Sequence, residues 1–132
     1  MTTSDLPAGG QPDVFPEGAE APFDDVITLS TSTSEDGVVT VTVVGEVDTF
    51  TAPVLRSTLD SQLEQQPREL VIDLSGVQFL GSAGLAVLVE TQKSSRSRDV
   101  ALRLIASTRA VTRPLEVTGL IDLFTIADST AR

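Results

Sequence analysis

The sequence predicts an α/β fold, in which a small mixed sheet opens with a β-hairpin and helices follow the second, third and fourth strands. Two observations lead to this prediction. Short β-branched or apolar runs alternate with longer segments in which apolar residues recur at helical spacing. The later strand segments are almost continuously apolar, which is typical of parallel strands with both faces covered. Parallel strands need crossover connections, and the intervening helices supply them.

The first two strands are expected at 26–32 and 38–45, where β-branched residues alternate with hydroxyl-bearing residues. The segment 34–37, Ser-Glu-Asp-Gly, has the composition of a tight turn, because Gly37 can adopt a positive φ. These two strands therefore form an antiparallel hairpin.

A helix is expected after the loop 45–50, Gly-Glu-Val-Asp-Thr-Phe. Thr51 can cap this helix, and Pro53 suits its first turn, where a missing N–H costs nothing. The apolar stripe of the helix consists of Leu55, Leu59 and Leu63, and the helix ends near Gln66-Pro67.

The second half of the chain repeats the strand–helix alternation. A buried strand is expected at 69–76, a loop at 76–84, and a helix at 83–95 with Ser82 as its N-cap. In that helix Leu85, Leu88 and Val89 should face the core and Glu90, Gln92 and Lys93 the solvent. The remaining elements are a strand at 100–106, a helix from Thr108 to the stop at Gly119 that Pro114 should bend or interrupt, and a last strand at 120–126.

The first 25 residues differ from the rest of the chain. They contain four prolines, three glycines and six carboxylates, with no lysine or arginine. Such a segment buries too little apolar surface to offset its chain entropy, so residues 1–25 are expected to form a disordered acidic tail and 26–132 the domain. The chain also lacks an apolar stretch of membrane-spanning length, which favours a cytoplasmic location.

The composition excludes several kinds of chemistry. The 132 residues include no cysteine or histidine, which rules out disulfides, Cys/His zinc sites and a Ser-His-Asp hydrolase. The formal net charge of -10 argues against a direct nucleic-acid partner, because phosphate-backbone binding needs a basic surface. We therefore expect a protein that is not an enzyme and has no catalytic residue, metal site or cofactor.

Ser82 in the segment Gly81-Ser-Ala-Gly84 is the candidate control point. The local sequence allows two interpretations of Ser82. It is only a helix cap, or it is a modification site to which the small neighbouring residues give access. A phosphate-binding loop would need more glycines and a lysine at the helix start, and a nucleophile elbow would need the pattern Gly-x-Ser-x-Gly and a histidine.

Three motifs occur together and in order: GEVD (45–48), VIDLSGVQFLGSAGLAVLV (71–89) and LEVTGLIDLF (115–124). With them, the region from about 26 to 127 resembles the anti-sigma factor antagonist family of bacterial STAS domains. The resemblance implies a STAS-like single domain, monomeric when free, that binds an anti-sigma factor of the serine-kinase type and thereby releases a sigma factor. Ser82 matches the serine that this kinase phosphorylates in the family, and a phosphoserine phosphatase would reverse the modification.

The resemblance also implies a partner-binding surface. Asp48 matches an acidic residue that lies beside the serine loop, and the expected surface comprises Asp48, Thr49, Gly81, Ser82, Ala83 and Gly84. The chain departs from the family at two positions, because Gly81 replaces the usual acidic residue and Ala83 a second hydroxyl. The resemblance implies that the loss of the carboxylate at 81 removes a hydrogen bond or charge contact with the kinase partner.

Alternatives stay open at this point. STAS domains also serve as accessory modules of membrane transport systems, in which Ser82 would only cap a helix, and an antagonist that is not phosphorylated is a further possibility. Asp48 has a local alternative as a cap of the first helix, through the N–H groups near Phe50 and Thr51. Asp73 and Ser75 match the family pattern but are interpreted as turn-forming residues, and the basic segment 92–99 as a solvated helix end.

Overall fold

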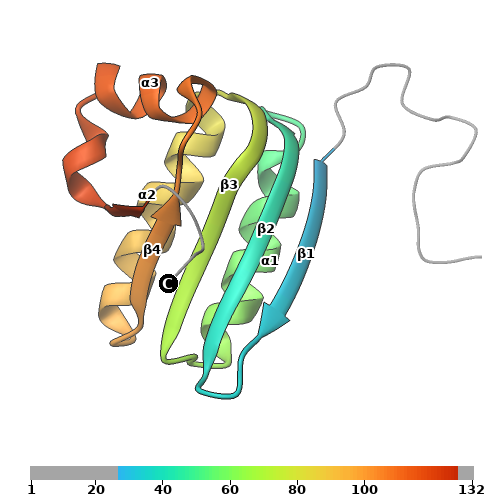
Figure 1. Ribbon diagram of the computed structural model, residues 1–132, viewed down its shortest axis with the longest axis vertical. Coiled ribbons are helices and arrows are strands. Elements are labelled where there is room, and N and C mark those ends of the chain that lie inside the picture. Colours follow the sequence, from blue (N-terminus) through green and yellow to red (C-terminus); the bar gives the residue numbers. More distant parts are fainter. Residues whose placement is uncertain (1–26, 128–132) are drawn as a thin grey trace, which may run out of the picture.

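The computed structural model describes residues 27–127 and confirms the predicted α/β fold (Figure 1). Its five strands form one sheet in the order β1-β2-β3-β4-β5, antiparallel between β1 and β2 and parallel elsewhere. Along the chain the elements are β1 (Ile27–Thr33), β2 (Val38–Val47), α1 (Ala52–Glu64), β3 (Glu69–Leu80), α2 (Ser82–Ser97), β4 (Ala101–Ile105), α3 (Arg109–Val117), the 3-10 helix η2 (Leu120–Leu123) and β5 (Thr125–Ala127). The predicted boundary between a tail and the domain lies outside the described residues.

The hairpin forms as predicted. Its register runs from Ile27 opposite Gly45 to Thr33 opposite Val39, and Gly37 has a φ of 87°. The Gly37 N–H donates to the carbonyl of Ser34 at 3.1 Å, which closes the turn. Because β1 is antiparallel to β2, Ile27 lies at the same end of the sheet as the carboxyl end of β2.

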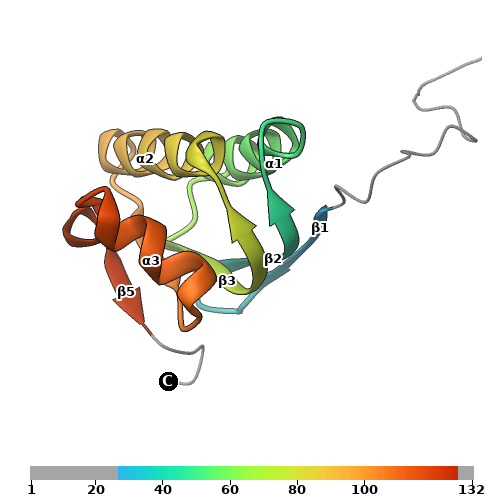
Figure 2. The same cartoon turned by 90° about the horizontal axis from the view of Figure 1, so that it is seen from above.

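The helices cover the sheet unequally. The two helices α1 and α2 lie side by side on one face, and α3 crosses the end of the sheet at which the parallel strands finish (Figures 1 and 2). Strand β3 pairs with β4 only from Glu69 to Asp73, so its last seven residues extend beyond β4, and α3 packs against β3. The long pair β2–β3 thus carries its carboxyl ends beyond the rest of the sheet.

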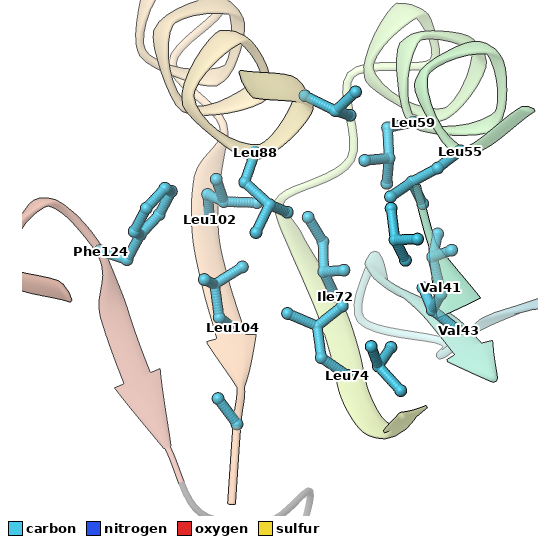
Figure 3. Packing of buried hydrophobic residues seen from close by; sticks show 14 of the residues in the cluster. Val41, Val43, Leu55, Leu59, Ile72, Leu74, Leu88, Leu102, Leu104 and Phe124 are labelled. Atoms are coloured by element: carbon cyan, nitrogen blue, oxygen red, sulfur yellow. The ribbon is translucent and has the colours of Figure 1, made fainter. Parts of the chain in front are cut away.

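The core lies between the sheet and the helix pair (Figure 3). The stripe of α1 predicted from the sequence, Leu55, Leu59 and Leu63, is buried. It packs in one cluster with alternate residues of β2 and β3 and with the inner face of α2, namely Val39, Val41, Val43, Leu70, Ile72, Leu74, Leu85 and Leu88. Burying side chains of this size contributes about 1.5–3 kcal/mol each, which makes the face under α1 and α2 the main source of stability.

Four expectations need correction. The segment 76–80 is not a loop but the continuation of β3, across an irregularity at which Val44 pairs with Gly76. Gln92 is buried rather than solvent-facing, because its amide donates to the carbonyl of Leu123. The predicted last strand is divided into η2 and β5, and Pro114 lies inside α3 without ending the helix.

Candidate functional site

The two segments expected to form the site emerge side by side at one end of the sheet. Strands β2 and β3 are parallel and their last residues, Val47 and Leu80, are register partners. The Gly81 N–H donates to the carbonyl of Val47 at 2.9 Å, which fixes the turn after β3 to the end of β2. The turn that begins at Asp48 and the turn at Gly81 therefore form one surface, as the sequence predicted.

Asp48 holds the first of these turns together. Its Oδ1 accepts hydrogen bonds from the N–H groups of Phe50 (2.9 Å) and Thr51 (3.0 Å), and its own N–H donates to the hydroxyl of Thr51 at 2.9 Å. The Thr51 hydroxyl in turn donates to the carbonyl of Glu46 at 2.7 Å. The expected bonds from Asp48 to the N–H groups of Phe50 and Thr51 thus form, but they hold the turn before α1, whose N-cap is Thr51. The contact of Asp48 with a partner stays a prediction.

Thr49 is exposed at the tip of this turn, and Thr51 precedes α1 as its N-cap residue. The Thr51 hydroxyl points back to β2 instead of to the helix, so Thr51 does not cap α1 with its side chain. The first turn of α1 contains a proline, as expected.

Ser82 lies one position later in its helix than predicted. Gly81 is the N-cap of α2, with an extended φ/ψ of -92°/-176°, and Ser82 is the first helical residue. A hydroxyl must stand at the non-helical cap position to reach the N–H groups of the first turn, so Ser82 makes no capping bond. Its side chain is exposed, and the structure gives its hydroxyl no hydrogen bond to any residue within 27–127.

The small residues around Ser82 have different surroundings. Gly84 is buried, and a Cβ placed on it would lie 2.6 Å from Leu80 Cδ1 and 2.6 Å from Val47 Cγ1. Its missing side chain therefore lets the first turn of α2 approach the ends of β2 and β3. Ala83 is half-buried and packs against the core, whereas Gly81 lies under the ring of Phe79.

Sequence reasoning missed the exposed apolar side chains at this end of the molecule. Phe50 is 73% exposed, Phe79 50% and Val54 50%. All three are close in sequence to the two turns, since Phe50 and Val54 flank the start of α1 and Phe79 precedes Gly81 by two residues. The sequence did contain a signal for these exposed side chains. The two phenylalanines stand immediately before or within turns rather than inside an apolar run.

Charged groups gather at the opposite end of the sheet. The hydroxyl of Ser34 donates to the Asp36 carboxylate and, together with Arg68 at 3.0 Å, lowers the pKa of Asp36 below its ordinary value. An open cavity of about 750 Å³ lies at this end of the sheet, and its lining includes the ion pairs Arg68–Asp36 and Arg103–Glu69. The closest N–O distance of the second pair is 3.2 Å.

Within residues 27–127 the structure contains no cluster of three or more histidine, cysteine or carboxylate side chains that could hold a metal ion. A helix long and apolar enough to cross a membrane is also not found in that part of the chain.

Comparison with known proteins agrees with this geometry. The STAS domain family model matches residues 31–132. The anti-sigma-F factor antagonist RsfB of Mycobacterium tuberculosis is 34% identical over 100 residues, which are 76% of this chain and 80% of that protein. The anti-sigma-B factor antagonist of Staphylococcus aureus is 30% identical over 99 residues, 75% of this chain and 92% of that protein.

A solved structure gives the same result. The crystal structure of an anti-sigma factor antagonist from Mycobacterium paratuberculosis aligns with a TM-score of 0.73 and 35% identity, and covers 82% of this chain and 91% of that one. The five-stranded mixed sheet with its three helices and the family match together define a STAS domain. The chain belongs to the STAS-domain family of anti-sigma factor antagonists.

Proposed function

We propose that this chain is an antagonist controlled by phosphorylation of Ser82. In the unphosphorylated state it binds an anti-sigma factor of the serine-kinase type, which then releases its sigma factor. The kinase phosphorylates Ser82 and ends the interaction, and a phosphoserine phosphatase restores the active state. The observation that carries the proposal is the Ser82 hydroxyl, which is exposed and has no hydrogen bond within the described residues, beside the Asp48 turn.

The chemistry requires little of this chain beyond access. The kinase transfers the γ-phosphoryl group of ATP to Ser82 Oγ: the new Oγ–P bond forms, the bond between phosphorus and the ADP oxygen breaks, and the hydroxyl proton goes to a base on the kinase. Because the hydroxyl has no bond to lose, the transfer does not break a cap. The Gly81 turn adds no side chain that would shield Oγ.

The modified side chain is compatible with the fold. Phosphorylation adds about 1.5–2 negative charges, and the N-terminus of a helix stabilises a negative charge by about 0.3–1 kcal/mol. Ser82 is the first residue of α2, so a phosphate there lies beside the N–H groups of the first helical turn. We therefore expect the phosphorylated chain to keep its structure and stability.

The same charge is incompatible with a packed interface. A buried and unpaired charge costs about 2–5 kcal/mol, which weakens binding by about 30-fold or more. Residues 48–51 and 81–83 form one surface, so a partner that covers the Asp48 turn also covers Ser82. Phosphorylation can thus separate the two proteins without a conformational change.

The first experiment incubates the full chain with ATP and an anti-sigma factor of the serine-kinase type from the same organism, and maps the phosphate by mass spectrometry. We expect one phosphate on Ser82 in the wild type and none in Ser82→Ala. Ser107→Ala is the matched control, because Ser107 is an exposed serine in the loop before α3. An unmodified wild type, or equal labelling of Ser82→Ala, would contradict the proposal.

The same experiment extends to binding. Ser82→Glu should weaken binding of the anti-sigma factor by about 30-fold or more and leave the melting temperature nearly unchanged, since an acidic residue suits the helix start. Isothermal titration calorimetry and thermal unfolding measure the two quantities on one sample. Unchanged affinity would show that the charge at this position does not control the complex.

A further inference from the structure

The aromatic side chains of the described region are distributed unusually. Of the three phenylalanines in residues 27–127, only Phe124 is buried, while Phe79 is 50% and Phe50 73% exposed. Single exposed apolar residues are common on protein surfaces, but exposed aromatic rings that gather at one site indicate a contact surface. Phe50 belongs to the turn after β2, and Phe79 lies near the end of β3, two residues before Gly81.

Phe79 is held in place by the backbone around it. It pairs with Glu46 in the β2–β3 ladder, at the end where Gly81 is fixed to Val47. Its ring lies against Gly81: the ring atoms Cε2 and Cζ are 3.0 Å and 3.2 Å from the place where a Cβ on residue 81 would be. The absence of a side chain at 81 therefore makes room for the ring, which covers the turn from which α2 begins.

The cross-strand neighbour of Phe79 is negatively charged. Glu46 is the register partner of Phe79, and Asp48 follows two residues later. On the helix side, Arg56 of α1 is paired with Glu90 of α2. A half-exposed aromatic ring next to carboxylates fits a partner whose apolar pocket is edged by lysine or arginine.

Building on the proposed function, we infer that Phe79, seated over Gly81, is the residue that anchors this chain in the anti-sigma factor. The partner presents an apolar pocket with a cationic edge. Aromatic side chains in fully desolvated pockets dominate the affinity of many interfaces. The glycine at 81 thus selects a partner that binds an aromatic ring at this point of the surface.

The anchor also strengthens the phosphorylation switch. Phe79 and Ser82 lie on either side of Gly81, so a partner that buries the ring must remove water from the adjacent helix start. A phosphate on Ser82 would be dehydrated in the same step, and that penalty opposes binding most strongly when the ring is fully buried.

The test measures binding of the purified anti-sigma factor to the unphosphorylated full chain by isothermal titration calorimetry. Phe79→Ala should weaken binding by about 30-fold or more, the range of an anchor residue. Val117→Ala is the matched control, since Val117 is an equally apolar side chain, 73% exposed at the end of α3, and should change the affinity by less than about twofold. Melting temperatures show whether each variant is folded.

A second variant approaches the same contact from the other side. Gly81→Asp adds a Cβ where the ring now lies, so the half-exposed ring must move by a few tenths of an ångström, and it places a carboxylate on the surface. We expect this folded variant to bind at least tenfold more weakly than the wild type.

The outcomes separate the inference from the function on which it rests. If the wild type does not bind the anti-sigma factor, the proposed function fails and the inference with it. If the wild type binds but Phe79→Ala binds as well as Val117→Ala, the inference is wrong and the function stands. Tighter binding of Gly81→Asp would also overturn the inference, because the partner would then recognise a carboxylate at 81 rather than the ring.

Discussion

Replacement of Gly84 by alanine tests whether α2 is positioned by close packing on the strand ends. The Cβ of the new residue would lie 2.6 Å from both Leu80 Cδ1 and Val47 Cγ1, and 3.2 Å from Val47 Cβ. The first two atoms belong to side chains that are 4% and 0% exposed, so they have little free space into which to turn. The third is attached directly to the backbone of β2, which cannot give way without moving the Asp48 turn.

The expected effect is the difference of two terms. Overpacking of a dense core costs about 1–3 kcal/mol, and two contacts at 2.6 Å between buried atoms favour the upper part of that range. Alanine inside a helix is more favourable than glycine by about 1 kcal/mol. We therefore expect Gly84→Ala to lower the free energy of unfolding by about 1–2 kcal/mol, and the melting temperature by about 4–8 °C for each kcal/mol in a domain of this size.

Urea and thermal unfolding followed by circular dichroism measure both quantities. The control is Ala86→Gly on the same helix, where the side chain is exposed and only the helix propensity changes, so a loss of about 1 kcal/mol is expected. If Gly84→Ala is as stable as the wild type or more stable, the close approach of α2 to β2 and β3 is not the reason for a glycine at this position.

Two further predictions concern the opposite end of α2 and the hairpin. Gln92→Leu preserves the bulk of the side chain but leaves the carbonyl of Leu123 without its donor, so we expect a loss of about 1–3 kcal/mol in urea unfolding, and an unchanged midpoint would contradict this. Asp36 has a lowered pKa because Ser34 and Arg68 favour its carboxylate, so its contribution to stability is complete above about pH 4 and disappears as the pH falls through the lowered value. Asp36→Asn should therefore be less stable than the wild type at pH 7 and approach it at a pH below the lowered pKa of Asp36 in urea titrations. A difference that does not depend on pH would refute the carboxylate's role.

The sequence was sufficient for the elements that local chemistry determines. The hairpin depends on Gly37 and on strand alternation, and the stripe of α1 depends on leucines at a spacing of four, so both formed where expected. The meeting of the two turns was also predictable, because parallel neighbouring strands end at the same edge of a sheet.

The corrections arise from contacts between segments that are distant in sequence. The last residues of β3 follow Ser75-Gly76, a pair typical of a turn, and they remain a strand because β2 pairs with them across an irregular register. Gln92 is buried because the carbonyl that it reaches lies 31 residues later. Propensity and periodicity describe neither kind of contact.

The start of α2, at the candidate site, is likewise determined by a contact between segments that are distant in sequence. A serine before an apolar helical run is ordinarily a cap, but the bond from Gly81 to Val47 fixes the extended residue one position earlier. The exposure of the Phe79 ring was not predicted either, because the strand in which it lies was expected to be a loop.

The two hydrogen bonds that enclose Gly81, to the carbonyl of Val47 on one side and from the N–H of Leu85 on the other, leave the serine on a turn that does not need to rearrange. Under the proposed function, the state of the protein would then depend only on whether Ser82 carries a phosphate. Return to the binding state would then proceed at the rate of the phosphatase, with no refolding or isomerisation step to delay it. A cell could reset such a protein many times without making a new copy.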